Sequence, residues 1–153
     1  MIQTSDRFYK NCKSFAFRQI LKVIYDSGKG YSFDEILKKV STLTHDSLSK
    51  KLNELLEEKC ISQKDRHPRF IAIQDKNYGR TFEWFVSEII KREMHGISCS
   101  GVKIRKLRSG GDFDVLCRLE DLLVHFECKS GSVNNITEDD ITKFIQRYKE
   151  LAP

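Results

Sequence analysis

The stretch Gly110–Lys129, GGDFDVLCRLEDLLVHFECK, decides how the second half of this chain folds. It holds two apolar runs, Phe113–Leu119 and Leu122–Cys128, each of ordinary strand length and rich in Val, Leu and Phe. Only Glu120 and Asp121 separate the runs, which is the spacing of a two-residue hairpin turn. The sequence therefore predicts an antiparallel pair of strands here.

The hairpin brings charged side chains together. Counting outward from the turn places Asp114 opposite Glu127 and Asp112 opposite Lys129. Side chains alternate along a strand, so Asp114, Glu127 and Lys129 share one face. The other face is expected to carry Val115, Val124, Phe126 and Cys128. Because Glu-Asp is a poor type I′ turn, a wider loop would shift this register by about one residue.

Two carboxylates at opposed positions of a sheet lie roughly 5 Å apart and repel each other. Asp114 and Glu127 therefore predict a cation between them. Carboxylate oxygens, with the backbone carbonyl of Cys128 nearby, suit a hard divalent cation such as Mg²⁺ or Mn²⁺. The alternative is a solvated outer face with scattered charges.

Asp114, the triplet Glu127-Cys128-Lys129 and the preceding pair Gly110-Gly111 resemble the PD-(D/E)XK nuclease superfamily. This group includes the restriction-endonuclease-like enzymes and the Holliday-junction-resolvase-like, Mrr-like enzymes. The resemblance covers roughly the second half of the chain and lacks the proline that often precedes the aspartate. It implies an αβββα core with a central mixed sheet and a Mg²⁺-dependent DNA endonuclease in which Asp114, Glu127 and Lys129 are catalytic. In that superfamily a further strand follows the last helix, and Pro153 falls where it would begin, so we expect either a trimmed sequence or a partner chain that completes the sheet.

A helix from about Thr81 to Met94 is expected to begin the nuclease-like part, which we assign to residues 76–153. Its apolar stripe is formed by Phe82, Phe85, Val86, Ile89 and Ile90. Glu83 falls beside that stripe and faces the core, where a carboxylate needs a cation or hydrogen bonds. The superfamily has a glutamate at the corresponding place in its first helix, so the resemblance makes Glu83 a fourth catalytic residue and a metal ligand. The alternative is a glutamate at the helix edge that reaches solvent.

Two more elements are expected around the hairpin. Val102–Leu107 is predicted to be a strand, with basic residues that contact phosphates or lie on a solvated edge: Lys103, Arg105, Lys106 and Arg108. Thr137–Asp140 begins a final helix that is expected to pack across the sheet through Ile141, Phe144, Ile145 and Tyr148. His125 shares the strand face of Glu127, where packing is favoured over a phosphate or metal contact.

Composition sets the outer limits. The 153 residues are 39% hydrophobic and 32% charged, which is typical of a globular protein of one ordinary or two small domains. The five cysteines are widely spaced and include no CxxC pair, so neither a disulfide framework nor a zinc site is indicated. No apolar run approaches the length of a membrane span, and the polar start lacks a signal-peptide core. We expect a cytoplasmic protein that is not bound to membranes.

The first half, residues 1–75, is predicted to be a winged helix-turn-helix domain. Cys12–Ser27 has the apolar spacing of a buried helix, and Ser32 with Glu35 forms a capping box for a second one. A third helix, capped by His45 or Asp46, is expected to place Leu48, Leu52, Leu55 and Leu56 on one side. Cys60–Gln63 and Arg69–Ile73 then pair as a two-stranded ribbon. Three helices followed by a ribbon resemble the winged-helix superfamily.

The winged helix is expected to bind DNA. The whole formal charge of +5 lies in residues 1–76, which suggests that this half meets a polyanion. The predicted contacts on the third helix and the ribbon are Ser47, Lys50, Lys51, Lys64, Arg66 and Arg69, with Ser49, Asn53 and His67 beside them. Glu54, Glu57 and Glu58 also lie on that helix, so a purely architectural role in dimerisation or docking stays open.

Two functions follow from these expectations. One is a metal-dependent endonuclease that acts on duplex or branched DNA as a homodimer. The other is a catalytically inert DNA-binding or regulatory module that keeps the nuclease fold. The complete set of Asp114, Glu127 and Lys129 favours the enzyme, because an inert site would be expected to have lost at least one of them.

Overall fold

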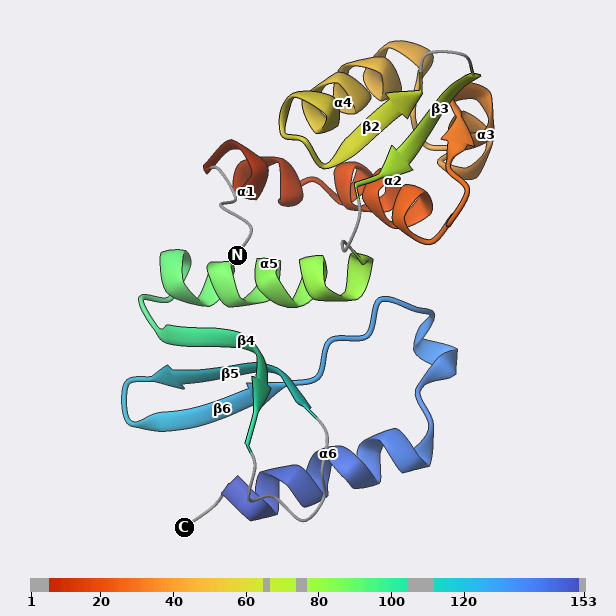
Figure 1. Cartoon of the computed structure of the whole chain (residues 1–153). Helices are drawn as coiled ribbons and strands as arrows, with labels where there is room; N and C mark the ends of the chain where they lie inside the picture. Colours follow the sequence, from red (N-terminus) through yellow and green to blue (C-terminus); the bar gives the residue numbers. More distant parts are fainter. Residues whose placement is uncertain (1–5, 65–66, 74–76, 105–111, 152–153) are drawn as a thin grey trace. The chain divides into compact units, whose positions relative to one another are not determined.

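The computed structural model describes residues 6–64, 67–73, 77–104 and 112–151. It is a mixed α+β structure, with six α-helices and two three-stranded antiparallel sheets within those ranges (Figure 1). The chain divides into two compact units, Met1–Tyr78 and Gly79–Pro153, close to the expected boundary between residues 75 and 76. None of the helices in the ranges above is long and apolar enough to cross a membrane.

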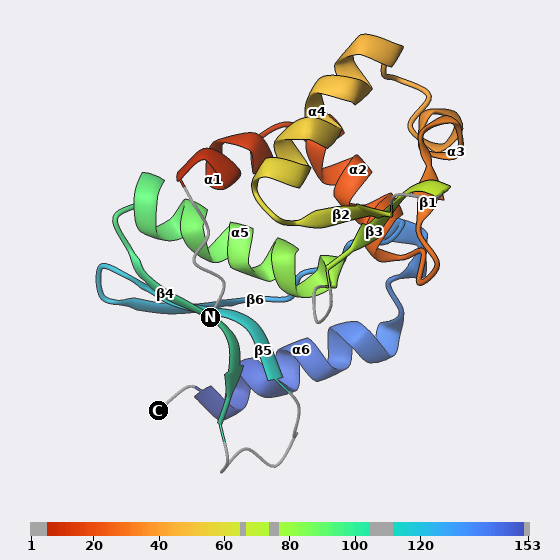
Figure 2. The same ribbon diagram turned by 45° about the horizontal axis from the view of Figure 1, so that its top comes forward.

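The first unit contains four helices and one small sheet. The helices are α1 (Asp6–Cys12), α2 (Phe15–Tyr25), α3 (Phe33–Lys39) and α4 (His45–Glu57). The strands are β1 (Tyr31–Ser32), β2 (Ile61–Lys64) and β3 (His67–Ala72). β3 lies between β1 and β2 and is antiparallel to both (Figure 2).

The helix expected over Cys12–Ser27 is present as α2, but it is shorter, because it begins at Phe15 and ends at Tyr25. α1 precedes it and was not expected. Ser14 is the N-cap of α2, and its hydroxyl accepts a hydrogen bond from the backbone N–H of Phe17 at 3.4 Å. Serine at this position competes with the helix for backbone donors, so a new helix begins. α2 is the centre of the core, because Phe17, Ile20, Leu21 and Ile24 are all buried.

The predicted N-cap is confirmed in α3, whereas in α4 the N-cap lies one residue before the first predicted position. The capping box of α3 is confirmed: Ser32 Oγ accepts from the N–H of Glu35, and Glu35 accepts from the N–H of Ser32 at 2.7 Å. In α4 the cap is Thr44, whose hydroxyl accepts from the N–H of Ser47 at 3.3 Å, and not His45 or Asp46. A threonine oxygen reaches the N3 amide from the extended backbone that Thr44 adopts, φ −77° and ψ 160°.

The ribbon forms as expected, and a third strand joins it. β1 pairs with β3 through Tyr31 and Phe70, which the sequence analysis did not foresee. The approach is possible because Gly30 has φ +74°, and a Cβ there would lie 2.7 Å from the carbonyl oxygen of Phe70. The tip residues 65 and 66 lie outside the described ranges.

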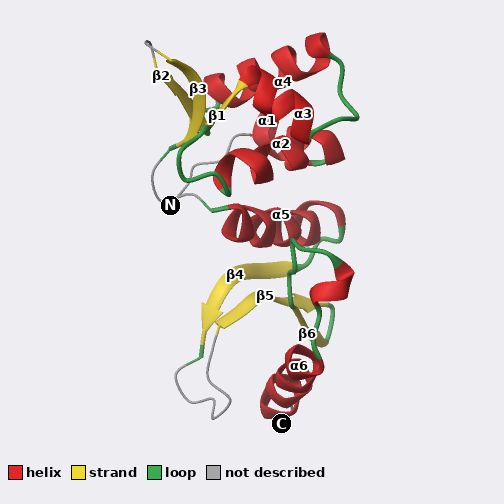
Figure 3. Cartoon of the chain, turned by 90° about the vertical axis from the view of Figure 1, so that its right-hand side faces the viewer, coloured by secondary structure: helices red, strands yellow, loops and turns green. Residues whose placement is uncertain are grey.

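The second unit has a sheet with helices on both of its sides (Figure 3). Its elements are α5 (Tyr78–Glu93), β4 (Ile97–Lys103), β5 (Asp112–Leu119), β6 (Leu122–Phe126), the short 3-10 helix η1 (Val133–Asn135) and α6 (Glu138–Leu151). The strand order is β4-β5-β6. All the pairs are antiparallel in the described part of the chain, so the expected mixed sheet is not seen there.

The predicted hairpin register is confirmed. Leu119 pairs with Leu122 and Val115 with Phe126, and Glu120 turns the chain with φ +52°. The apolar face is also confirmed, since the buried cluster around α5 consists of Ile90, Val115 and Cys117, with Val86, Leu119, Val124, Phe126 and Cys128 packed against it.

β4 begins earlier than predicted, at Ile97 and not at Val102. The earlier start brings Ser98 into the core, where its hydroxyl pairs with that of Ser87 on α5 at 3.0 Å. The predicted basic residues Arg105, Lys106 and Arg108 lie outside the described ranges.

α6 is placed as predicted, but its expected packing is only partly right. Phe144 stacks on His125 with ring centroids 4.1 Å apart. Ile141, Ile145 and Tyr148, which were expected to pack across the sheet, are exposed.

His125 makes the stability of this unit sensitive to acid. The ring is buried between Phe113 and Phe144, and that burial lowers its pKa, an effect that Glu127 opposes and Arg147 reinforces. The unfolded chain then binds a proton more readily, so stability is complete above the ordinary histidine pKa of about 6.5 and is lost as the pH falls below it. We expect His125→Phe to reduce the drop in urea-unfolding free energy between pH 7.5 and 5.0, whereas the exposed His45→Gln leaves it unchanged. Equal drops in both variants would contradict this role.

Candidate active site

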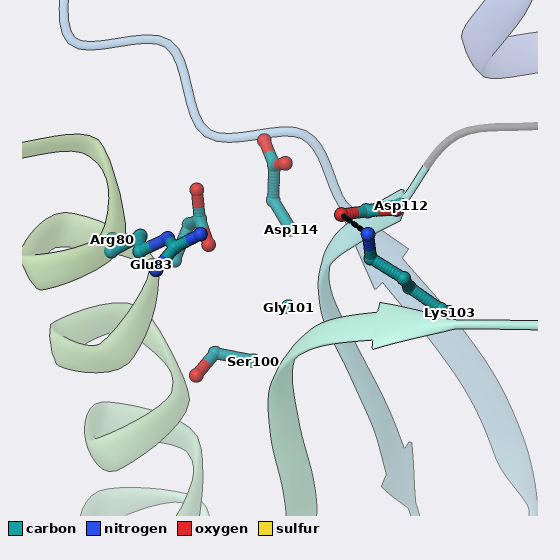
Figure 4. Close-up of a pocket in the computed structure, with 7 residues that line it drawn as sticks. All are labelled: Arg80, Glu83, Ser100, Gly101, Lys103, Asp112 and Asp114. Atoms are coloured by element: carbon teal, nitrogen blue, oxygen red, sulfur yellow. Dashed lines mark ion pairs between the residues drawn. The ribbon is translucent and has the colours of Figure 1, made fainter. Parts of the chain in front are cut away.

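Two acidic side chains from different elements face one pocket in the second unit. Glu83 comes from α5 and Asp114 from β5, and Figure 4 shows Glu83 on the helix with Asp114 across the opening from it. The pocket has a volume of about 370 Å³ and is lined by Arg80, Glu83, Ser100, Gly101, Lys103, Asp112 and Asp114. The structure therefore brings together two of the four predicted catalytic residues here.

Asp114 is held by the end of the hairpin. The pairing of β5 with β6 ends at Val115 and Phe126, so Glu127 lies just beyond the last pair. There the Asp114 carboxylate accepts a hydrogen bond of 2.6 Å from the backbone N–H of Cys128. This bond fixes Asp114 beside the Glu127-Cys128-Lys129 segment.

Asp112 differs from the expectation. It was predicted to lie opposite Lys129, but β5 continues along β4 beyond the end of β6, and Asp112 pairs there with Lys103. Their side chains form an ion pair of 3.4 Å at the rim of the pocket (Figure 4).

Two of the three carboxyls that line the pocket, those of Asp114 and Glu83, hold protons more strongly than usual. Burial raises the pKa of Asp114, an effect that the Cys128 N–H opposes. Burial also raises the pKa of Glu83, and the nearby charge of Asp114 adds to it. Carboxyls with raised pKa values that face one pocket are typical of functional sites, and a bound cation would compete with their protons.

The other two predicted residues belong to an ion-pair network with α6. Lys129 Nζ lies 3.1 Å from Glu127 Oε1 and 3.1 Å from Asp140 Oδ1. Arg147 Nη1 lies 3.0 Å from Glu127 Oε2. Both oxygens of Glu127 are thus engaged by side-chain cations, which offset the repulsion that the sequence analysis predicted between Glu127 and Asp114.

The network sets the charge of Lys129. Hydrogen bonds to Asp140 and Glu127 raise the pKa of Lys129, so the ammonium keeps its proton at neutral pH. Hydrogen bonds from Thr137 and Lys129 lower the pKa of Asp140, so that carboxylate stays ionised. In this arrangement Lys129 is a protonated hydrogen-bond donor.

The fit of a divalent cation is partial. Within the described ranges, no group of three or more His, Cys, Asp or Glu side chains is close enough to hold a metal ion. Asp114 and Glu83 offer two hard oxygen donors with raised pKa values to the pocket, which suits Mg²⁺ with several retained waters. Glu127 already forms ion pairs with Arg147 and Lys129, so its carboxylate would have to bind the metal ion in addition to these two cations. The carbonyl of Cys128 as a metal ligand stays a prediction. Burial raises the pKa of the Cys128 thiol to about 12.

Two residues of this site, Asp140 and Arg147, were not among the residues predicted from the sequence. The side chain of Arg147 is only 16% exposed, and its Nε is buried without a partner. One signal was available: positions 140, 144 and 147 fall on one face of α6, and Phe144 was expected to face the sheet.

The predicted DNA-contacting residues of α4 differ in how exposed they are. Lys50 is exposed on α4, and Ser47 is half-buried in its first turn. Lys51 lies with its ammonium 6.0 Å from the ring of Phe17, so it is directed over the core.

Of the predicted DNA-contacting residues in the β-ribbon, only the side chain of Arg69 is described by the structure. Arg69 was predicted to bind phosphate, but it pairs with Glu35 at 3.1 Å and donates to the carbonyl of Gly30. These bonds join the ribbon to α3 and to the segment before β1, so the guanidinium of Arg69 is engaged within its own unit. Arg66 lies outside the described ranges, and the side chain of Lys64 is not described either.

These placements make Lys50 the clearest test of the DNA-binding expectation. We expect Lys50→Ala to weaken duplex binding and to reduce the slope of log K against log salt by about 0.9, because one phosphate contact is lost. Lys38→Ala removes another exposed lysine, from α3, and is expected to change neither quantity. Fluorescence anisotropy over a salt series measures both. Identical slopes for both variants and the wild type would indicate that α4 does not contact DNA.

Comparisons of the chain with protein-family models, with curated proteins and with solved structures found no match.

Proposed function

We propose that this protein is a metal-dependent endonuclease that hydrolyses phosphodiester bonds of duplex or branched DNA. In this proposal the first unit is a winged helix-turn-helix domain that binds the DNA, and the second is a nuclease domain of the PD-(D/E)XK kind. The observation that carries the proposal is the 2.6 Å bond from the Cys128 N–H to Asp114. It sets Asp114 beside Glu127 and Lys129 while Glu83 faces Asp114 across one pocket.

The pocket carries charges of both signs. Arg80 and Lys103 line it together with Glu83, Asp112 and Asp114, and Lys103 pairs with Asp112. A bound cation would offset the carboxylates, so that the site could take a phosphodiester, which is an anion. A Mg²⁺ or Mn²⁺ ion held by Asp114, Glu83 and Glu127 would polarise the phosphate and lower the pKa of a bound water. The cations of the chain attract the phosphate, and its carboxylates supply the oxygen donors.

Lys129 acts as a positioning donor in this proposal. Its raised pKa leaves it protonated, so it donates a hydrogen bond to the attacking water or to a phosphate oxygen. Glu127 and Asp140 orient the ammonium. Arg147, on α6, holds the carboxylate of Glu127 in place. It therefore acts through Glu127 and does not contact the substrate.

A cleavage assay tests the proposal. Purified protein is incubated with supercoiled, linear, branched and single-stranded DNA and with RNA, in the presence of Mg²⁺, Mn²⁺ or EDTA. The proposal expects nicking or cutting of duplex or branched DNA that needs the metal and stops with EDTA. If no DNA is cut with either metal, the enzyme assignment fails.

One observation favours the alternative, a catalytically inert DNA-binding or regulatory module. Arg147 and Lys129 already neutralise Glu127, as side-chain cations would in a site that no longer binds metal. An inert module would bind DNA without cutting it and would not respond to Mg²⁺. The cleavage assay and the metal titration described below distinguish the two.

A further inference from the structure

A second hollow adjoins the ion-pair network of the candidate active site, between the end of the hairpin and the start of α6. It has a volume of about 150 Å³ and is lined by Glu127, Lys129, Ile136, Asp140, Ile141 and Phe144. The surface inside it is mainly apolar. A group that fills this hollow therefore lies next to the Lys129 ammonium, which the proposed function places at the phosphodiester.

The apolar part of the lining consists of side chains that remain partly in water. Ile136 follows η1 and is 43% exposed, and Ile141 lies in the first half of α6 and is 52% exposed. Phe144 is half-buried, and its ring stacks on His125. A cavity of about 150 Å³ that is lined by Leu, Ile and Phe side chains holds one benzene ring. The hollow therefore has room for one six-membered ring.

The charged part of the lining favours an uncharged occupant. Two carboxylates, those of Glu127 and Asp140, line the hollow together with the single ammonium of Lys129. Arg147 brings a second cation, which pairs with Glu127 at 3.0 Å. The two negative and two positive charges cancel, so the hollow offers no net attraction to a phosphate, whereas an uncharged group with a polar edge can meet these side chains.

We propose that the hollow binds one unpaired nucleobase of the DNA substrate, next to the phosphodiester that is cleaved. This inference rests on the proposed function, because it takes Lys129 as the donor at that phosphodiester. A nucleobase is uncharged, and its apolar faces suit the side chains of Ile136, Ile141 and Phe144.

The size of the hollow also restricts the substrate class. A hollow for one ring accepts a base only after that base has left the stack, which costs free energy in a paired duplex and least where the base is already unpaired. The substrate is therefore DNA with an unpaired nucleotide beside the cleaved bond, as at a branch point or in a single strand.

Methyl NMR on the whole chain tests the base site without metal or cleavage. Thymidine 5′-monophosphate is titrated in EDTA into protein with isotope-labelled isoleucine methyl groups, and deoxyribose 5-phosphate is the matched ligand without a base. The signals of Ile136 and Ile141 are expected to shift to saturation with the nucleotide only. Ile97, which is 65% exposed on β4, should not respond. No shift at Ile136 and Ile141, or equal shifts with both ligands, overturns the proposal.

Two isoleucines of α6 provide a matched pair of variants. Ile141→Ala removes part of the apolar lining and should raise the Kd of the nucleotide by about 5-fold or more, because less apolar surface is buried against the base. Ile145→Ala is the control, since Ile145 is 45% exposed on the same helix but is not among the residues that line the hollow. Its variant should bind like wild type. Equal Kd values for the two variants overturn the proposal.

The titration and the cleavage assay can fail separately. Nucleotide binding without cleavage of any DNA would support the base site and remove only the enzyme, whereas cleavage without nucleotide binding would keep the enzyme and overturn the base site. If DNA is cut, a substrate with an unpaired nucleotide at the cleaved bond should be cut faster than a fully paired duplex. Ile141→Ala should reduce that preference, and Ile145→Ala should keep it.

Discussion

Lys129→Ala is expected to lower the rate of metal-dependent DNA cleavage by about 10²- to 10⁴-fold, the usual cost of losing one positioned donor or acid-base group. The ammonium is held 3.1 Å from both Glu127 and Asp140, so its position is set before substrate binds. Removing it leaves Asp114, Glu83 and the first unit in place, and DNA affinity should change little. Single-turnover cleavage and anisotropy measure the two quantities separately.

The control for this variant has to come from outside the pocket. Lys103 is unsuitable, because it lines the pocket and pairs with Asp112. Lys91 lies in the last turn of α5 and pairs with Glu88, so Lys91→Ala removes the same charge away from the site. It should cut nearly as well as wild type. Wild type, Lys129→Ala and Lys91→Ala with equal activity would identify a contaminant, and the inert-module alternative would then replace the enzyme.

Asp114→Asn is expected to have opposite effects on stability with and without metal. Burial raises the pKa of Asp114 in the folded state, so keeping it ionised costs stability once the pH exceeds the unfolded pKa of about 4. Asparagine removes that cost at pH 7, and its side-chain oxygen still accepts the Cys128 N–H. The metal-free variant should therefore melt at or above the temperature of wild type.

The metal titration should reverse that order. An ion that binds only the native state at about 100 times its Kd stabilises by roughly 2.7 kcal/mol, which for a unit of this size raises Tm by roughly 10–20 °C. Asp114→Asn should lose most of this rise, whereas Asp121→Asn, in the exposed hairpin turn, should keep it. Calorimetry with millimolar Mg²⁺ or Mn²⁺ measures the shift. A wild-type Tm that does not move with metal would contradict a cation site at Asp114.

The sequence by itself determined the features that depend on local periodicity and hydrogen bonding. The register of the β5–β6 hairpin followed from alternation and a two-residue turn, because a shift by one residue would turn its apolar side chains to the wrong face. The capping box of Ser32 and Glu35 followed from a spacing of three residues. The position of Glu83 beside the apolar stripe of α5, on the side that faces the core, followed from helical geometry.

Other features were decided only by the tertiary structure, because they join residues far apart in the chain. Arg147 reaches Glu127 across 20 positions, and Asp112 turns to Lys103 once β5 extends beyond β6. Arg69 pairs with Glu35, 34 positions away, although its sequence neighbours suggested a phosphate contact. Spacing along the chain determines which face of a helix or strand a side chain occupies. Packing between elements determines which oppositely charged group that side chain meets. A charged group that is removed from water needs such a partner, and only the tertiary structure supplies it.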